Sequence, residues 1–140
     1  MKSAMATKTY HGSCHCGRIR FEADIDLAQG TGKCNCSFCW KARNWSVGLK
    51  PEAFRLLTDK ANGSEYGFRP GSTNHHVFCK VCGIRVYTYG DIPEIGGPYV
   101  SVALAALDDL PPADLVAAPV RHMNGRDDDW FHVPAETRHL

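Results

Sequence analysis

The sequence predicts a mainly β protein built from small sheets, and three observations carry this prediction. Apolar residues alternate with polar ones over short stretches, most clearly at Ile19, Phe21, Ala23 and Ile25. Glycine and proline residues separate these stretches, as expected of turns between strands. The chain up to Gly71 shows no apolar repeat with the period of a helix.

The start of the chain and its first strand are predicted from the same signals. Residues 1–8 have no periodic pattern, so we expect a flexible start there. We expect one domain over residues 9–140, because a chain of 140 residues can bury one hydrophobic core but not two. The alternation from Ile19 to Ile25 predicts a strand with one apolar face, and residues 29–32 predict a turn.

The rest of the chain predicts further short strands in the same way. Residues 58–71 are rich in turn-forming residues and predict a hairpin around Tyr66 and Phe68. Two consecutive prolines end the last clear alternation, after which residues 119–123 predict one more strand and residues 124–130 a loop. The alternating side chains of these predicted strands are Trp45, Val47 and Leu49, then Phe54 and Leu56, then Val77 and Cys79, then Ile84, Val86 and Thr88, and finally Val100, Val102 and Leu104.

Charge and hydropathy argue against several classes of protein. Sixteen basic against fifteen acidic residues give a net charge of +1, and residues 127–129 are the main block of like charge, so a nucleic-acid partner is not expected. No stretch approaches the roughly 18 consecutive apolar residues of a membrane span. Residues 1–10 lack the apolar centre of a signal peptide, so we expect a cytoplasmic protein.

Seven cysteines in the spacings C-x-C and C-x-x-C predict metal binding. A cytoplasmic chain keeps its thiols reduced, and an odd number argues further against a disulfide framework. Thiolate sulfur is a soft donor that suits zinc. Cys34, Cys36 and Cys39 place three thiols on a short stretch, where they can bind one zinc ion and leave a coordination position open.

The other four cysteines form two pairs that predict a second, structural zinc site. Cys14 and Cys16 would point to the same side of a strand, since alternate residues share a face. Cys79 and Cys82, followed by Gly83, predict a zinc knuckle, in which backbone N–H groups point at sulfur and the glycine relieves a strained backbone. Four thiolates leave zinc no open position, so this site would be closed.

Two questions about these sites stay open from the residues alone. Cys34 and Cys36 could instead join one of the pairs, although that grouping would leave thiols without a metal. A histidine could complete the three-thiol site and make it structural, the candidates being His15, His75 and His76. If a substrate thiol fills the position instead, coordination would deprotonate it and align it with an electrophile.

Residues near the three-thiol stretch are candidates for substrate binding. Lys33, Lys41 and Arg43 could hold an anionic substrate, although solvated surface charge is the ordinary interpretation of such residues. His76, three residues before Cys79, could act as an acid or base, or be a hydrogen-bonded strand histidine.

The order of these motifs resembles the glutathione-dependent formaldehyde-activating enzyme and centromere protein V family. The motifs are Gly-Ser-Cys-His-Cys-Gly at residues 12–17, Cys-x-Cys-x-x-Cys at residues 34–39 and Phe-Cys-x-x-Cys-Gly-Ile at residues 78–84. Residues 124–130 are also similar to the family's ending. The chain departs from the formaldehyde-activating members in having Asn35 where they usually carry histidine, which is more similar to the centromere branch.

The resemblance implies a β-tent fold of small antiparallel sheets with zinc knuckles and two Zn²⁺ ions in each chain. The implied activity is that of a carbon–sulfur lyase, the condensation of formaldehyde with glutathione to S-(hydroxymethyl)glutathione. The implied ligands are Cys14, Cys16, Cys79 and Cys82 for a structural zinc, and Cys34, Cys36 and Cys39 for a catalytic zinc.

Two hypotheses about function remain. The first is a zinc-dependent carbon–sulfur lyase that acts on a small thiol, glutathione by default, and a small aldehyde. The second is a non-catalytic zinc module that binds protein, or, against the near-neutral charge, nucleic acid. Replacing Cys39 by serine separates them, because a functional site can lose its metal without loss of the fold.

Overall fold

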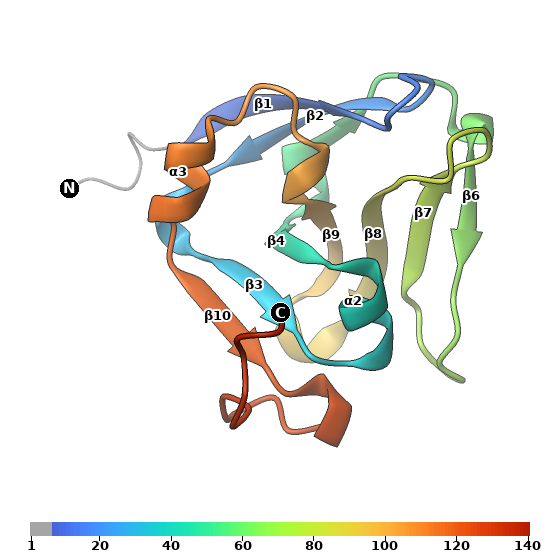
Figure 1. The fold of residues 1–140 in the computed structure, drawn as a ribbon. Coiled ribbons are helices and arrows are strands. Elements are labelled where there is room, and N and C mark those ends of the chain that lie inside the picture. The colour runs from blue at the N-terminus through green and yellow to red at the C-terminus, as the bar shows by residue number, and fades with distance from the viewer. Residues whose placement is uncertain (1–6) are drawn as a thin grey trace.

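The computed structural model describes residues 7–140, and it confirms the mainly β prediction. The smaller of its two sheets has three antiparallel strands in the order β1-β2-β5. Figure 1 shows β1 and β2 crossing one end of the molecule, above the larger sheet. The bounds are Lys8–Ser13 for β1, Arg20–Ile25 for β2 and Phe54–Leu56 for β5.

The larger sheet has seven strands in the order β10-β3-β4-β9-β8-β7-β6. Its neighbours are antiparallel, except that β10 runs parallel to β3. The predicted strand at residues 119–123 is therefore confirmed, as an edge strand. The bounds are Thr31–Cys34 for β3, Trp45–Leu49 for β4, Gly63–Tyr66 for β6, His75–Cys79 for β7, Arg85–Ile92 for β8, Gly97–Ala103 for β9 and Val120–Met123 for β10.

The hydrophobic core lies between the two sheets. Burial alternates along β2 as predicted, and Phe21, Ala23 and Ile25 are fully buried. Phe54 on β5 joins the sheets, since its ring centroid lies 5.2 Å from that of Phe21 and 4.7 Å from that of Tyr87 on β8. The core therefore fixes the relative position of the strands that flank the cysteine pairs.

Two short helices were not predicted. Helix α2 (Ser37–Ala42) begins inside the three-cysteine stretch, where Cys36 caps it by accepting the N–H of Cys39 at 3.4 Å. Helix α3 (Pro112–Ala117) begins at the prolines that were expected only to end a strand, because the fixed φ of proline suits a first helical turn. A helix of six residues is too short to show a period.

Two local predictions need correction. The hairpin expected within residues 58–71 is formed by β6 and β7, so Phe68 lies in their connection rather than on a strand. Strand β1 ends before the first cysteine pair, and the N–H of Gly17 closes a turn onto the carbonyl of Cys14 at 3.2 Å.

The expected flexible start lies mostly outside the described residues, and Lys8 already belongs to β1. The division into this start and a domain over residues 9–140 stays a prediction. Among residues 7–140, no helix has the length and apolar character that a membrane crossing requires.

The turn between β7 and β8 has the geometry predicted for a knuckle. The N–H groups of Val81 and Cys82 point at Cys79 Sγ, at 3.3 and 3.4 Å. Gly83 has a φ of +77°, which an L side chain adopts only with strain.

Replacing Gly83 by alanine is expected to lower the free energy of unfolding by about 1–2 kcal/mol, because alanine is strained at this φ. Gly48→Ala on β4 is the matched control, since its added Cβ would meet nothing within 4 Å. Urea unfolding of the metal-loaded proteins measures the difference. Equal midpoints for the two variants would contradict the strain argument.

Candidate metal centre

One cluster consists of four thiols whose sulfur atoms all lie within 4.8 Å of one another: Cys14, Cys16, Cys79 and Cys82. Cys16 Sγ lies 3.7 Å from Cys14 Sγ and 3.6 Å from Cys79 Sγ. The cluster ties the turn after β1 in the smaller sheet to the β7–β8 turn in the larger one. The predicted grouping into four and three is therefore the one that the structure shows.

Backbone donors surround the sulfur atoms of this cluster. Besides the two N–H groups at Cys79, the N–H of Ile19 points at Cys14 Sγ at 3.3 Å. The backbone N–H and then the side chain of Arg18 lower the pKa of Cys16 to about 6. Such donors stabilise thiolate, the form that binds metal.

The second cluster consists of Cys34, Cys36 and Cys39, whose sulfur atoms also lie within 4.8 Å of one another. Cys34 ends β3, Cys36 is the N-cap of α2, and Cys39 lies within that helix. The N–H of Cys36 points at Cys34 Sγ at 3.5 Å. Hydrogen bonds from the thiols of Cys34 and Cys39 hold the pKa of Cys36 far below its usual range.

Both clusters could hold a metal ion. Their donors are sulfur only, a set that fits a soft or borderline cation such as zinc. Among the residues that the structure describes, no histidine or carboxylate joins the three-thiol group within 4.8 Å. His15 is exposed, and His75 Nδ1 lies 3.1 Å from Glu65 Oε1, so neither completes this group.

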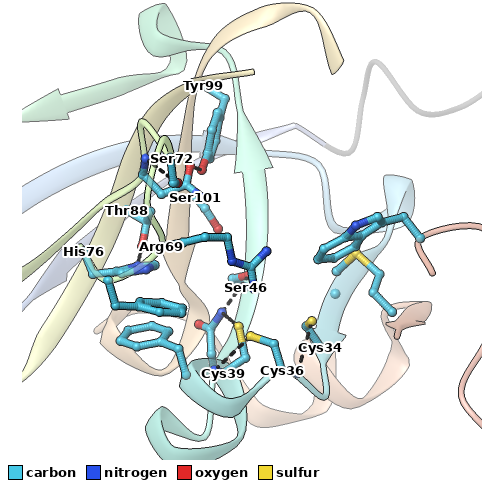
Figure 2. Close-up of a pocket in the computed structure, with 17 residues that line it drawn as sticks. Cys34, Cys36, Cys39, Ser46, Arg69, Ser72, His76, Thr88, Tyr99 and Ser101 are labelled. Carbon is cyan, nitrogen blue, oxygen red and sulfur yellow. Dashed lines mark hydrogen bonds between the residues drawn. The ribbon is translucent and has the colours of Figure 1, made fainter. Parts of the chain in front are cut away.

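A pocket of about 200 Å³ opens against the three thiols. Figure 2 shows the cysteines together at one end, with Arg69 lying between them and Tyr99 in this view. His76 also lines the pocket and stacks on Phe38, with their ring centroids 3.8 Å apart.

The environment of His76 keeps its ring neutral. Burial, reinforced by the charge of Arg85, lowers the pKa of His76 to about 4. Its Nδ1 lies 2.7 Å from Thr88 Oγ1, which also accepts a hydrogen bond from Arg85 Nη1 at 3.2 Å. Nε2 is therefore the ring atom left for a ligand in the pocket.

A half-buried arginine, Arg85, is linked to the three-thiol cluster through Asn44. Arg85 Nη2 donates to Asn44 Oδ1, and Asn44 Nδ2 donates to Cys39 Sγ at 3.6 Å. Arg85 Nε is buried without a hydrogen-bond partner. A buried cation is costly unless compensated, and the negative charge of three thiolates would compensate it. Neither Arg85 nor Asn44 was predicted to be part of the site. The sequence signal for Arg85 is a cation on an alternating strand, and Asn44 has none.

The family can now be identified. Residues 9–124 match the family described as glutathione-dependent formaldehyde-activating enzyme. The chain belongs to the glutathione-dependent formaldehyde-activating enzyme family. A solved structure of a Rhodobacter sphaeroides protein is also similar, with a TM-score of 0.65 and 26% sequence identity over 79% of this chain and 99% of that one. The resemblance inferred from the cysteine motifs is confirmed.

In this member of the glutathione-dependent formaldehyde-activating enzyme family, Asn35 holds the segment after β10 against the three-thiol cluster. Asn35 Nδ2 donates to Asn124 Oδ1 at 2.9 Å, and its Oδ1 accepts the N–H of Arg126 at 2.9 Å. A Cβ at the intervening Gly125 would lie 2.6 Å from Cys34 Sγ. Only glycine fits between this segment and the thiols.

Gly125→Ala is expected to speed the release of metal from the three-thiol cluster, because its Cβ would displace Cys34 or the ring of Trp130, 2.7 Å away. Changes behind metal ligands typically cost roughly 10- to 100-fold in affinity. Transfer of zinc to a chromophoric chelator measures release, with Gly48→Ala as the control. Release at the control rate would contradict the packing argument.

The residues predicted to bind substrate differ in whether they line this pocket. His76 lines the pocket, whereas Lys41 is exposed on α2 and is not among the lining residues. Arg43 Nη1 donates to the carbonyl of His139 at 2.6 Å, and Lys33 Nζ to that of Leu140 at 3.1 Å. Lys33 and Arg43 therefore contact the chain's own residues, and they line a different pocket, which also contains Cys34 and Cys39. The arginine that lines the pocket described above, Arg69, was not predicted.

Proposed function

We propose that this protein is a zinc-dependent carbon–sulfur lyase that joins a thiol to a small aldehyde such as formaldehyde and releases the aldehyde in reverse. The observation that supports it best is three converging thiols at a pocket, with no fourth ligand from residues 7–140. The family description supplies glutathione and formaldehyde as the default substrates. The seven cysteines are free in the structure, as expected of a cytoplasmic protein, where thiols are kept reduced.

In this proposal the two clusters have different roles. Cys14, Cys16, Cys79 and Cys82 hold a structural zinc, because four thiolates complete its coordination. A second zinc on the three-thiol cluster would, when bound, keep an entering thiol as thiolate at neutral pH.

The chemistry requires no oxidant or reductant. A sulfur–carbon bond forms, the carbonyl electron pair moves to oxygen, and the proton lost by the thiol ends on the new hydroxyl. His76 is placed to carry that proton on Nε2, since Thr88 fixes its Nδ1. Phe38, Met123 and Trp130 give the pocket apolar walls that limit water near the reacting atoms.

The proposal is tested by measuring the rate of adduct formation between glutathione and formaldehyde with exchange NMR, in the presence of the zinc-loaded protein. Because thiols add to formaldehyde unaided, the protein must raise the rate above that background. His76→Gln is expected to lower the enzymatic rate by about 100-fold, the usual scale for a proton-transfer residue. A wild-type rate equal to the background, both with glutathione and with a small thiol such as 3-mercaptopropionate, would refute the lyase and favour the partner-binding module.

A further inference from the structure

Arg69 is a cation in the pocket that has no acidic partner. It lies in the connection between β6 and β7 and lines the pocket that contains the three thiols. No carboxylate among residues 7–140 forms an ion pair with it. By contrast, Arg55 is paired with Glu22 and Asp24. The Arg69 guanidinium is thus available to an anion that enters the pocket.

The remaining lining of the pocket offers no second charge of either sign, apart from the thiols. None of its 17 residues is a lysine, an aspartate or a glutamate, and His76 is neutral. A second carboxylate on the ligand would therefore have no cation to pair with. An ammonium group would have no carboxylate, and it would lie near Arg69, which repels it.

Neutral donors lie close to Arg69 in the chain. Ser72 Oγ accepts the N–H of Asn74 at 3.1 Å, which leaves the Ser72 hydroxyl proton for another acceptor. Tyr99 and Asn74 are hydrogen-bonded to each other in the same pocket. The Arg69 guanidinium and a hydroxyl group of the pocket lining are donors that suit one carboxylate.

One wall of the pocket is aromatic. The rings of Phe68 and His76 each stack on Phe38, at centroid distances of 5.8 and 3.8 Å. The pocket volume of about 200 Å³ is below the roughly 300–1,000 Å³ typical of sites for drug-sized ligands. A short carbon chain would fit along this wall, whereas much of a tripeptide would lie outside.

We propose that the preferred thiol is a small mercaptocarboxylate with a single negative charge and no ammonium group, whose carboxylate pairs with Arg69 while its sulfur reaches the three-thiol cluster. This inference rests on the proposed function for the thiol, and it narrows the substrate class below that of glutathione. Arg69 is then the residue that determines specificity.

Calorimetric titration of the zinc-loaded chain with 3-mercaptopropionate, cysteamine and glutathione tests this directly, without any need for turnover. We expect 3-mercaptopropionate to bind about 10- to 100-fold more tightly than cysteamine, the scale of one hydrogen-bonded ion pair. Arg69→Ala should abolish that preference and Arg69→Glu should reverse it, while Arg69→Lys keeps part of it. Arg20→Ala, which removes an exposed arginine from β2, is the control and should bind as the wild type does.

Equal binding of the two small thiols, tighter binding of glutathione, or a preference that survives Arg69→Glu would each overturn the inference. A measured preference without catalysis above background would uphold it while refuting the lyase. Catalysis above background without the preference for 3-mercaptopropionate would uphold the lyase and refute the inference about Arg69. The two proposals therefore fail separately.

Discussion

Replacing Cys79 by serine is expected to unfold the protein, even when zinc is in excess. Cys79 is 1% exposed, and its sulfur lies in the four-thiol cluster that joins the two sheets. Structural zinc contributes on the order of 10–16 kcal/mol to small domains, which is comparable with a total stability of about 5–15 kcal/mol. A serine hydroxyl is a poor zinc ligand, so the loss exceeds what the remaining core can supply.

Far-ultraviolet circular dichroism and urea unfolding of the zinc-loaded variant measure this effect. Val81→Ala is the matched control, because Val81 lies in the same turn but is 63% exposed. It should unfold cooperatively, close to the wild-type midpoint. If Cys79→Ser also does so, the four-thiol cluster is not what joins the sheets.

Cys39→Ser has the second large expected effect, which is loss of function rather than of fold. The three-thiol cluster lies on one short stretch formed by the end of β3 and the start of α2, so its metal joins no distant elements. We expect one of the two zinc ions to be lost and adduct formation to fall to the uncatalysed rate. The free energy of unfolding should fall by only about 1–3 kcal/mol, within the range of single substitutions.

Part of the expected fall in the free energy of unfolding has a specific cause. Asn44 would no longer donate to a thiolate, and the half-buried Arg85 would face less negative charge. Ser37→Ala on the same helix is the control, since Ser37 is exposed and not a metal donor. The zinc content and the urea unfolding of both variants measure the loss of metal and the change in stability. Global unfolding of Cys39→Ser would make the site structural.

The strands and both cysteine clusters could be predicted from sequence because their signals are local. The alternation along β2 extends over six residues, and two cysteines followed by Gly83 are enough to predict the knuckle. The division of the seven cysteines into a group of four and a group of three follows from the coordination number of zinc alone. Helix α2 was missed because six residues show no period, and because its cap is a cysteine rather than a usual capping residue.

The pocket could not be predicted, because it is assembled from residues that are distant in sequence. Arg69 lies in the connection between β6 and β7, and the sequence does not show that these two strands form one hairpin. Arg85 lies on the following strand, β8. Proximity in sequence instead selected Lys41 and Arg43, which lie outside this pocket. Lys33 and Arg43 do lie near the thiols, in a second pocket lined by Cys34 and Cys39, but tertiary packing places Arg69 in the pocket described above.

The central claim is that the three-thiol cluster binds zinc and admits a sulfur ligand from outside the chain. X-ray absorption fine structure at the zinc edge, recorded on zinc-loaded protein with a small selenol in place of the thiol, tests it most directly. The account predicts a zinc–selenium shell of about half an atom per zinc, since one of two ions has an open position. Full zinc occupancy with no zinc–selenium shell would contradict it.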